Sequence, residues 1–240
     1  MSTNLAGGVC IGELKAAIFR AARLSANCTP LGGVNGGLVT AGLVTMTADP
    51  IVKEGVSLEQ ENGAGDLLFS YESDDKLKGY TISGEMGFAD FEMMALLFGG
   101  SVILGKAGGD YAGTVIGYAD PNYTAPARYG TYLEVITLAV EEGAGDCVAS
   151  DGGAPVAIGN IFGKAKLRSG SISFGNDIQR VSFTGKSVTN PNLFNGPWND
   201  YPGAGYIPNT PRAKVGYTQA EYDAILATVQ CGYVDLPTGS

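Results

Sequence analysis

The stretch Leu67–Gly100 constrains the fold more than any other, because it joins two alternating strands to one short and almost wholly apolar helix. Apolar and polar residues alternate along Leu67–Glu72 and again along Tyr80–Met86, which gives each strand one apolar and one polar face. The intervening Ser73–Gly79 contains two aspartates and a glycine, which favour a turn. The pattern predicts that the two strands form a β-hairpin that leads directly into the helix.

The predicted helix is apolar on nearly every side. Asp90 can cap it, and Gly99 can end it, since glycine adopts a left-handed cap conformation without steric cost. Its first apolar stripe consists of Phe91, Met94, Ala95 and Phe98, and its second of Met93 and Leu97. One sheet covers only one stripe, so the second is covered either by the core of the same domain or by a neighbouring subunit. The features below favour the subunit.

Composition indicates a β-rich protein. Glycine supplies 37 of the 240 residues, and only 16% of the residues are charged. Many short apolar runs lie between these glycines, which is typical of an all-β or β-rich α+β fold. No apolar run is long enough to span a bilayer, and the N-terminus lacks the basic start of a signal peptide. We therefore expect a protein that is made and kept in a cytoplasm, with no membrane partner.

The chain lacks the residues that several kinds of catalysis require. Histidine is absent, which excludes Ser-His-Asp and Cys-His catalysis and histidine metal ligands. The four cysteines are scattered without a CxxC pair, so they fit neither a zinc site nor a dense disulfide framework. The net charge of −9 argues against a protein that wraps nucleic acid, because neutralising phosphates requires clustered Lys and Arg. We expect no enzymatic activity, no metal and no cofactor.

Short strands are predicted over much of the remaining chain. They are Leu38–Thr47 with an interruption at Gly42, Val56–Glu61, Val102–Leu104, Thr114–Tyr118, Asn160–Arg168, Ser171–Phe174 and Ile178–Val188. Tyr132–Val140 is the most hydrophobic strand and should be central, since it is apolar on both faces except at Glu134 and Thr137.

Two further segments have helical features. Glu13–Leu24 has apolar spacing that is compatible with either a helix or a strand. Thr218 and Glu221 form a capping box for a helix that extends to Val229 and should pack on the outside of the β core.

A basic patch is predicted on one strand. Lys164, Lys166 and Arg168 are spaced two residues apart, which places three positive charges on one strand face. Arg180 and Lys186 can extend this patch from the neighbouring strand. A nucleic-acid surface needs interleaved aromatic residues and an excess of base, which this acidic chain lacks. Two interpretations remain open: a salt-bridged contact with an acidic face of another subunit, or a plain solvated strand face.

Several motifs occur in a recognisable order. They are Glu54/Gly55 with Asn62/Gly63, the Asp75–Tyr80 segment DKLKGY, the helix pattern of Asp90–Gly99, and Ser182–Pro197, which runs from SFTGK to NGP. In their order and spacing these stretches resemble the major tail protein (tail tube protein) of long-tailed bacteriophages with non-contractile tails, notably those infecting actinobacteria. The resemblance covers residues 17–200. The tail after Asp200 and the Gly105–Ala127 region lie outside it.

The resemblance implies a β-rich α+β fold, namely the phage tail-tube fold, in which an antiparallel β-sandwich or barrel is flanked by one α-helix, here with an extra C-terminal helix. It also implies that Ile18–Leu24 is a strand. The implied organisation is an N-terminal arm over residues 1–16, a tail-tube β domain over 17–199 with its helix near 90–98, and a C-terminal extension over 200–240 with a helix near 218–229.

The resemblance further implies a structural virion protein without enzymatic activity or cofactor. Such protomers form hexameric rings, and the rings stack into a tube through which DNA is ejected into the host without specific binding. The implied partners are other copies of the protein and the tape measure, tail terminator and distal tail proteins. The implied location is the virion tail, with assembly in the host cytoplasm.

Two sets of site residues follow as hypotheses. The proposed subunit-interface residues are Phe91, Met93, Met94, Leu97, Phe98, Lys164, Lys166 and Arg168. Glu72 and Glu85, on the polar faces of the predicted hairpin, are expected to face the lumen. An acidic wall repels DNA, so the DNA cannot adsorb and stall.

Other functions remain as alternatives. A capsid decoration protein or a glycan-binding, adhesin-like domain would stay monomeric or trimeric, with Trp198, Tyr201 and Tyr206 contacting sugar. A tube protein of bacterial type VI secretion is a nearer alternative. An enzyme that uses carboxylates alone would need a carboxylate pair whose pKa values are pushed apart, and the sequence indicates none.

Overall fold

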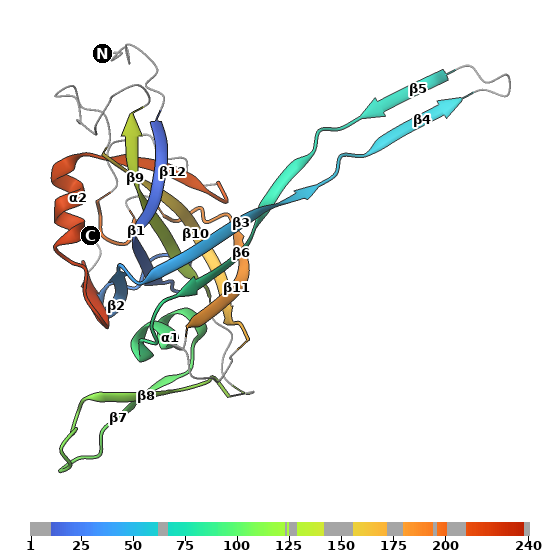
Figure 1. Cartoon of the computed structure of the whole chain (residues 1–240). Helices are drawn as coiled ribbons and strands as arrows, with labels where there is room; N and C mark the ends of the chain where they lie inside the picture. The colour runs from blue at the N-terminus through green and yellow to red at the C-terminus, as the bar shows by residue number, and fades with distance from the viewer. Residues whose placement is uncertain are drawn as a thin grey trace.

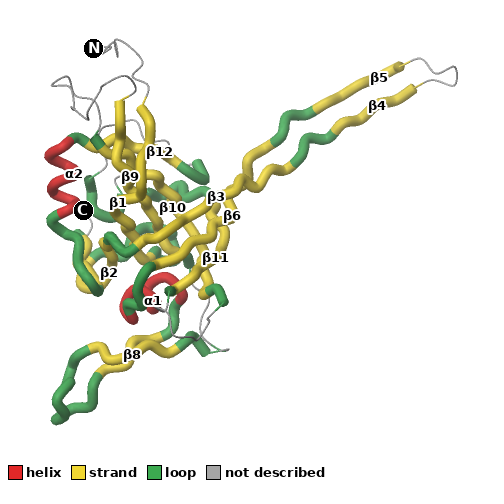
Figure 2. Tube along the Cα trace, in the orientation of Figure 1, coloured by secondary structure: helices red, strands yellow, loops and turns green. Residues whose placement is uncertain are grey.

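The protein is β-rich, with one large antiparallel sheet. The structure, a computed structural model, describes residues 11–61, 67–122, 124, 129–141, 156–171, 180–193, 196–200 and 210–237. Figure 1 shows a β body from which two hairpins project, and Figure 2 colours the same view by element type.

The described elements are β1 (Ile11–Arg23), β2 (Gly33–Thr40), β3 (Leu43–Lys53), β4 (Ser57–Glu61), β5 (Leu67–Glu72), β6 (Lys76–Met86), α1 (Phe91–Phe98), β7 (Ser101–Leu104), β8 (Val115–Ala119), β9 (Thr131–Glu141), β10 (Ala157–Ser169), β11 (Val181–Val188), β12 (Ala213–Tyr217), α2 (Gln219–Leu226) and β13 (Tyr233–Leu236).

The main sheet has nine strands in the order β13-β2-β1-β9-β10-β11-β6-β3, with β12 paired to β10 beside this path. Strand β9 pairs with β1 on one side and β10 on the other. Its residues 131–137 are buried on both faces, so the predicted central position of Tyr132–Val140 is confirmed. Glu13–Leu24, which the pattern left open, belongs to strand β1 up to Arg23.

The inner core forms where the sheet curves around helix α1. Strand β3, at the end of the sheet, lies against β1, and α1 packs against β1, β2 and β10. The core includes Phe19, Leu38, Ile82, Met93, Leu96, Leu97, Leu133, Phe162 and Phe183. These side chains come from six strands and the helix, so folding of α1 and closure of the sheet depend on the same burial.

Both predicted ends of α1 are confirmed. The Asp90 carboxylate accepts hydrogen bonds from the amides of Glu92 and Met93 at 2.9 and 3.2 Å, and Gly99 caps the C-terminus with φ of 88°. Asp90 also accepts from the Gly232 amide at 2.7 Å. The start of the helix is therefore tied to the turn that leads into β13.

The expectation that a neighbouring subunit covers the second stripe of α1 is wrong. Met93 and Leu97 are fully buried in the core of their own chain, and Phe98 is only 6% exposed. The helix has cover on two sides, because the curved sheet lies on one and the base of the β7–β8 hairpin on the other. Among the predicted interface residues of α1, only Phe91, which is 39% exposed, and the half-buried Met94 keep substantial accessible surface.

The predicted hairpin between Leu67–Glu72 and Tyr80–Met86 is also wrong. Strand β5 pairs with β4, whereas β6 pairs with β3 and β11. The two sides of one long hairpin are therefore β3–β4 and β5–β6, interrupted at residues 54–56 and 73–75, and its outer part projects far from the body (Figure 1). Alternation along a strand defines its faces but does not say which strand lies beside it.

The segment Ser73–Gly79, expected to form the turn of the predicted hairpin, instead contributes hydrogen bonds at this interruption. The Gly55 amide donates to the Asp75 carboxylate at 2.7 Å, and the Val56 amide donates to the Ser73 hydroxyl at 2.8 Å. These bonds join the two sides of the long hairpin where the regular ladder is broken.

The C-terminal segment is part of the sheet rather than an extension of it. Strand β12 pairs with β10, and β13 pairs with β2. The predicted boundary at residue 200 therefore separates strands that share one sheet. The predicted N-terminal arm over residues 1–16 also overlaps the sheet, since β1 begins at Ile11; residues 1–10 lie outside the described residues.

The capping box of the C-terminal helix is confirmed. The Thr218 side chain accepts from the Glu221 amide, and the Glu221 side chain accepts from the Thr218 amide. The α-helix ends at Leu226, before the predicted Val229. Ile225 is buried against the outer face of the sheet, as expected for a helix packed outside the β core.

A buried ion pair holds the C-terminal segment on this outer face. Arg20 on β1 lies directly opposite Glu134 on β9, and the two side chains are 2% and 0% exposed. The Arg20 guanidinium donates to Glu134 at 2.8 Å and to Asp200 at 2.5 Å. Tyr217 donates to Glu134 at 2.6 Å, and Trp198 lies over the guanidinium at 4.5 Å. Residues of the C-terminal third thus complete a cluster that begins on two central strands.

The charges of this cluster support one another. Burial opposes the charge on Arg20, but the nearby Glu134 carboxylate acts together with Tyr132, Tyr217 and Asp200 to outweigh burial. Their combined effect raises the pKa of the guanidinium well above its usual value. Burial and then Glu134 raise the pKa of the Tyr217 hydroxyl, which therefore stays protonated and able to donate. Removing one charge leaves the other buried without its partner.

The substitution Glu134→Ala tests this dependence. It should lower the free energy of unfolding by about 3–5 kcal/mol, because Arg20 then stays buried without its main counter-ion. Urea unfolding followed by the fluorescence of Trp198, the only tryptophan, measures the change. The control Glu59→Ala, at an exposed residue, should change the value by less than about 0.5 kcal/mol. A loss at Glu134 no larger than the control would contradict the assignment.

Candidate functional site

One part of the outer sheet face is polar and exposed, over strands β10, β11, β6 and β3. Hydroxyl residues line up across these strands, with Thr47 opposite Ser83 and Ser83 opposite Thr184. The hydroxyls of Thr47 and Ser83 lie 2.7 Å apart. We call this surface the polar sheet face. Opposite residues of antiparallel strands share a face, so its composition follows from the register.

The predicted basic residues lie on this face. Lys166 and Arg168 are exposed, whereas Lys164 is half-buried, with its Nζ 3.0 Å from the Cys28 sulfur. Lys186 is also exposed and lies directly opposite Lys166, so the predicted extension of the patch by Lys186 is confirmed. We call Lys166, Arg168 and Lys186 the basic patch. Within the described part of the chain, none of the three forms a salt bridge.

The other predicted charges are arranged differently. Arg180 does not extend the basic patch, because it pairs with Glu85 at 3.2 Å. Glu85 lies on the main sheet, opposite Ser182, whereas Glu72 lies on β5 in the projecting hairpin. The structure therefore does not bring Glu72 and Glu85 onto one wall, since that expectation required β5 to pair with β6. That either residue faces a lumen stays a prediction.

The outer part of the long hairpin, strands β4 and β5, is amphipathic. We call residues 54–75 the arm. On one face Leu58 lies opposite Tyr71, and Gln60 lies opposite Phe69. The apolar residues of this face are half exposed: Leu58 55%, Phe69 52% and Tyr71 50%. The opposite face carries Ser57, Glu59, Ser70 and Glu72.

Sequence reasoning identified both strands of the arm but missed its shared apolar face. Each strand alternates in the sequence, and that alternation was the available signal. The pairing of β4 with β5 is what places their apolar residues side by side. Two-stranded ribbons are marginally stable alone in water, so an exposed apolar face on such a ribbon indicates a contact surface.

A second hairpin projects from the body below α1 (Figure 1). It consists of β7 and β8, as the predicted strands Val102–Leu104 and Thr114–Tyr118 indicated. Its exposed apolar residues are Ile103 at 46%, Leu104 at 56%, Tyr111 at 68% and Ile116 at 48%. The molecule thus presents two ribbons with uncovered apolar side chains.

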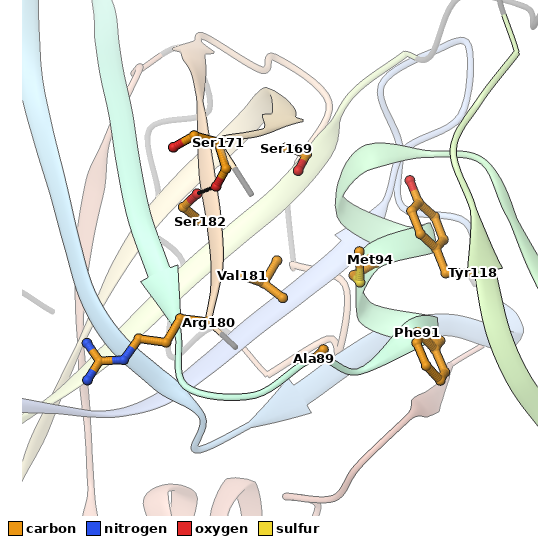
Figure 3. Close-up of a pocket in the computed structure, with 9 residues that line it drawn as sticks. All are labelled: Ala89, Phe91, Met94, Tyr118, Ser169, Ser171, Arg180, Val181 and Ser182. Carbon is orange, nitrogen blue, oxygen red and sulfur yellow. Dashed lines mark hydrogen bonds between the residues drawn. The ribbon is translucent and has the colours of Figure 1, made fainter. Parts of the chain in front are cut away.

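The accessible helix residues Phe91 and Met94 line a small hollow (Figure 3). Its volume is about 160 Å³, and its wall includes Tyr118 and Val181. Small-molecule sites usually have volumes of about 300–1,000 Å³. The hollow is therefore better described as an apolar depression beside α1 than as a ligand pocket.

A larger cavity of about 420 Å³ lies where β3 approaches β1. Glu13 lines it and accepts hydrogen bonds from Thr137 at 3.0 Å and Asn160 at 2.8 Å, and it forms an ion pair with Lys214. Burial opposes the ionised form of Glu13, but these hydrogen bonds, that of Lys214 first, outweigh it and lower the pKa of the carboxyl.

The aromatic residues considered for sugar binding are only partly described. Trp198 packs against Tyr132, with ring centroids 6.0 Å apart, and over Arg20, so these contacts occupy the ring. Tyr201 and Tyr206 lie outside the described residues. Among the residues that are described, no group of three or more His, Cys, Asp or Glu side chains is placed to hold a metal ion. The helices in this part of the chain are too short or too polar to cross a membrane.

The Glu13 cluster gives a pH-dependent prediction. Because the folded-state pKa of Glu13 is lowered, its contribution is present above the unfolded-state value near 4.5 and is lost as the pH falls through the folded-state value. Glu13→Gln should therefore cost less than about 1 kcal/mol at pH 7, since the group is partly exposed, and less still near pH 3. Urea unfolding at both pH values measures the difference. An equal cost at both values would show that ionisation of Glu13 contributes nothing.

Comparison with known proteins adds no family to this description. No protein-family model matches the sequence, and a search of curated proteins finds no match.

Proposed function

We propose that this protein is a structural subunit that assembles with copies of itself into the tail tube of a long non-contractile-tailed bacteriophage. In this proposal, hexameric rings stack into a tube, and DNA passes through the lumen without specific binding. Tape measure, terminator and distal tail proteins are the other partners. The ring and tube geometry comes from the sequence resemblance.

The uncovered apolar face of the arm is the observation that carries self-association. Leu58, Phe69 and Tyr71 are each about half exposed on a ribbon that has no second layer behind it. Burying such side chains against another subunit releases roughly 1 kcal/mol each, at about 25 cal/mol per Å² of apolar surface. A repeated assembly multiplies this gain, because every copy offers an arm and a receiving surface.

This support differs from the one expected from sequence. The second stripe of α1 no longer argues for a partner, because Met93 and Leu97 are buried inside the chain. Phe91, Met94, Lys166 and Arg168 keep the accessible surface that an interface requires. The proposal therefore rests on the projecting hairpins and the sheet surface, with α1 as an internal support.

Self-assembly of the full-length protein tests the proposal. Sedimentation velocity over a range of concentrations and negative-stain microscopy should show rings or tubes above a critical concentration. Phe69→Ser combined with Tyr71→Ser should raise this concentration about tenfold or more, because two apolar contacts are lost per arm. A matched control is Leu226→Ser, which removes a residue of similar exposure (48%) from α2.

The control should assemble at the wild-type concentration, and both variants should keep the wild-type unfolding midpoint. A wild-type protein that stays monomeric at all concentrations would contradict the proposal. A discrete trimer, or sugar binding by the monomer, would favour a decoration or glycan-binding protein instead.

A further inference from the structure

The negative charge of this protein is concentrated in the arm. Residues 54–75 contain seven carboxylates, Glu54, Glu59, Glu61, Asp66, Glu72, Asp74 and Asp75, and no Lys or Arg. The other residues hold the remaining 17 acidic and all 15 basic side chains, a net charge of only −2 against −9 for the whole chain. In the described part of the arm, Glu59 and Glu72 are exposed and form no salt bridge.

The basic patch has the opposite excess of charge, which is positive. Lys166 and Lys186 lie directly opposite each other on neighbouring strands, and Arg168 follows two residues along β10. Like charges placed directly opposite across strands destabilise a sheet. No carboxylate among the described residues forms a salt bridge with these three side chains. In the isolated chain, exposed cations therefore repel one another on the basic patch, and exposed anions repel one another on the arm.

Both charge sets lie on paired antiparallel strands, and each contains one diagonal pair. Glu59 on β4 and Glu72 on β5 lie on the same face of the arm. They are diagonal neighbours, because Glu59 lies opposite Ser70 and Glu72 lies opposite Ser57. Lys166, Lys186 and Arg168 occupy neighbouring positions on two paired strands of the main sheet. Both sets therefore follow the same strand geometry, about 5 Å across strands and about 7 Å along them.

We propose that the acidic face of the arm of one copy docks on the basic patch of another copy. The inference rests on the self-assembly proposed above and names the electrostatic contact within it. The arm projects away from the body of its own chain (Figure 1), so a second chain has to supply the partner. Beyond the interruption, the six residues of β5 alone extend roughly 20 Å at about 3.4 Å per residue, which lets the arm reach a neighbouring body.

The contact joins two different surfaces, so copies can form it head to tail, as a heterologous contact. A pair joined in this way still has one free arm and one free patch, and repetition of the contact produces a ring or an open polymer. Nucleic acid is the other polyanion that could meet a basic patch. The arm is favoured because the chain carries its acidic partner in equal supply, and because three cations without interleaved aromatic residues are few for a nucleic-acid surface.

Charge reversal with the full-length protein tests the contact. Lys186→Glu should raise the critical concentration for assembly about tenfold, because it reverses one charge of the patch. It should not lower the unfolding midpoint, since the introduced carboxylate lies opposite Lys166 and relieves the repulsion there. Lys15→Glu, at an exposed residue of β1, is the matched control and should leave assembly unchanged.

A charge swap makes the test specific. Lys166→Glu with Lys186→Glu should prevent assembly, and so should Glu59→Lys with Glu72→Lys. All four substitutions in one chain should restore it to within about threefold of the wild type, because the complementarity is rebuilt with opposite signs. The critical concentration of the wild type should also rise with NaCl, since the contact is exposed to solvent.

Three results would overturn the inference, and they separate it from the proposed function. If the wild type assembles and the reversals behave like Lys15→Glu, the arm-to-patch contact fails while self-assembly stands. If the wild type never assembles, both fail. If the patch reversals leave assembly intact but abolish binding of a 30-base-pair duplex measured by fluorescence anisotropy, the patch belongs to nucleic acid.

Discussion

The ion pair between Arg20 and Glu134 is stable only while the C-terminal segment covers it. The two residues lie opposite each other on β1 and β9, in the middle of the sheet, and water is kept away by Trp198, Asp200 and Tyr217. A charge pair in that position is costly to expose and costly to split, so the cover and the sheet depend on each other. This explains why the chain after residue 200 contributes two strands and a helix to the body.

The same cover divides the outer sheet face into two parts. Over β2, β1 and β9 the face is apolar around the buried Arg20–Glu134 pair and carries the C-terminal segment with buried Ile225. Over β11, β6 and β3 the face carries hydroxyl and charged side chains and lies open to solvent. The arm continues from this open part. The surfaces that we assign to assembly are therefore those that the chain does not need for its own core.

The sequence suggested that helix α1 contacts another subunit, whereas the structure buries α1 and leaves the arm uncovered. Helix α1 is apolar on nearly every side because its own chain covers most of it, with the curved sheet on one side and a hairpin on the other. The arm has ordinary alternating strands, yet its apolar side chains Leu58, Phe69 and Tyr71 are each about half exposed on a ribbon without a second layer. Apolar content alone did not distinguish a buried element from an interface, because both have apolar surface that must be kept from water. Only the fold decides whether the same chain or another subunit covers that surface.

The sequence by itself determined the local features: the β-rich class, the Asp90 and Gly99 ends of α1, the capping box at Thr218 and the central place of β9. Each follows from short-range chemistry or from the period of apolar residues. It also placed Lys166 and Arg168 on one strand face. Tertiary structure decided the pairing of β5 with β4, the internal cover of Met93 and Leu97, and the meeting of Lys186 with Lys166. These depend on which distant segments lie together, and strand alternation carries no information about the partner strand.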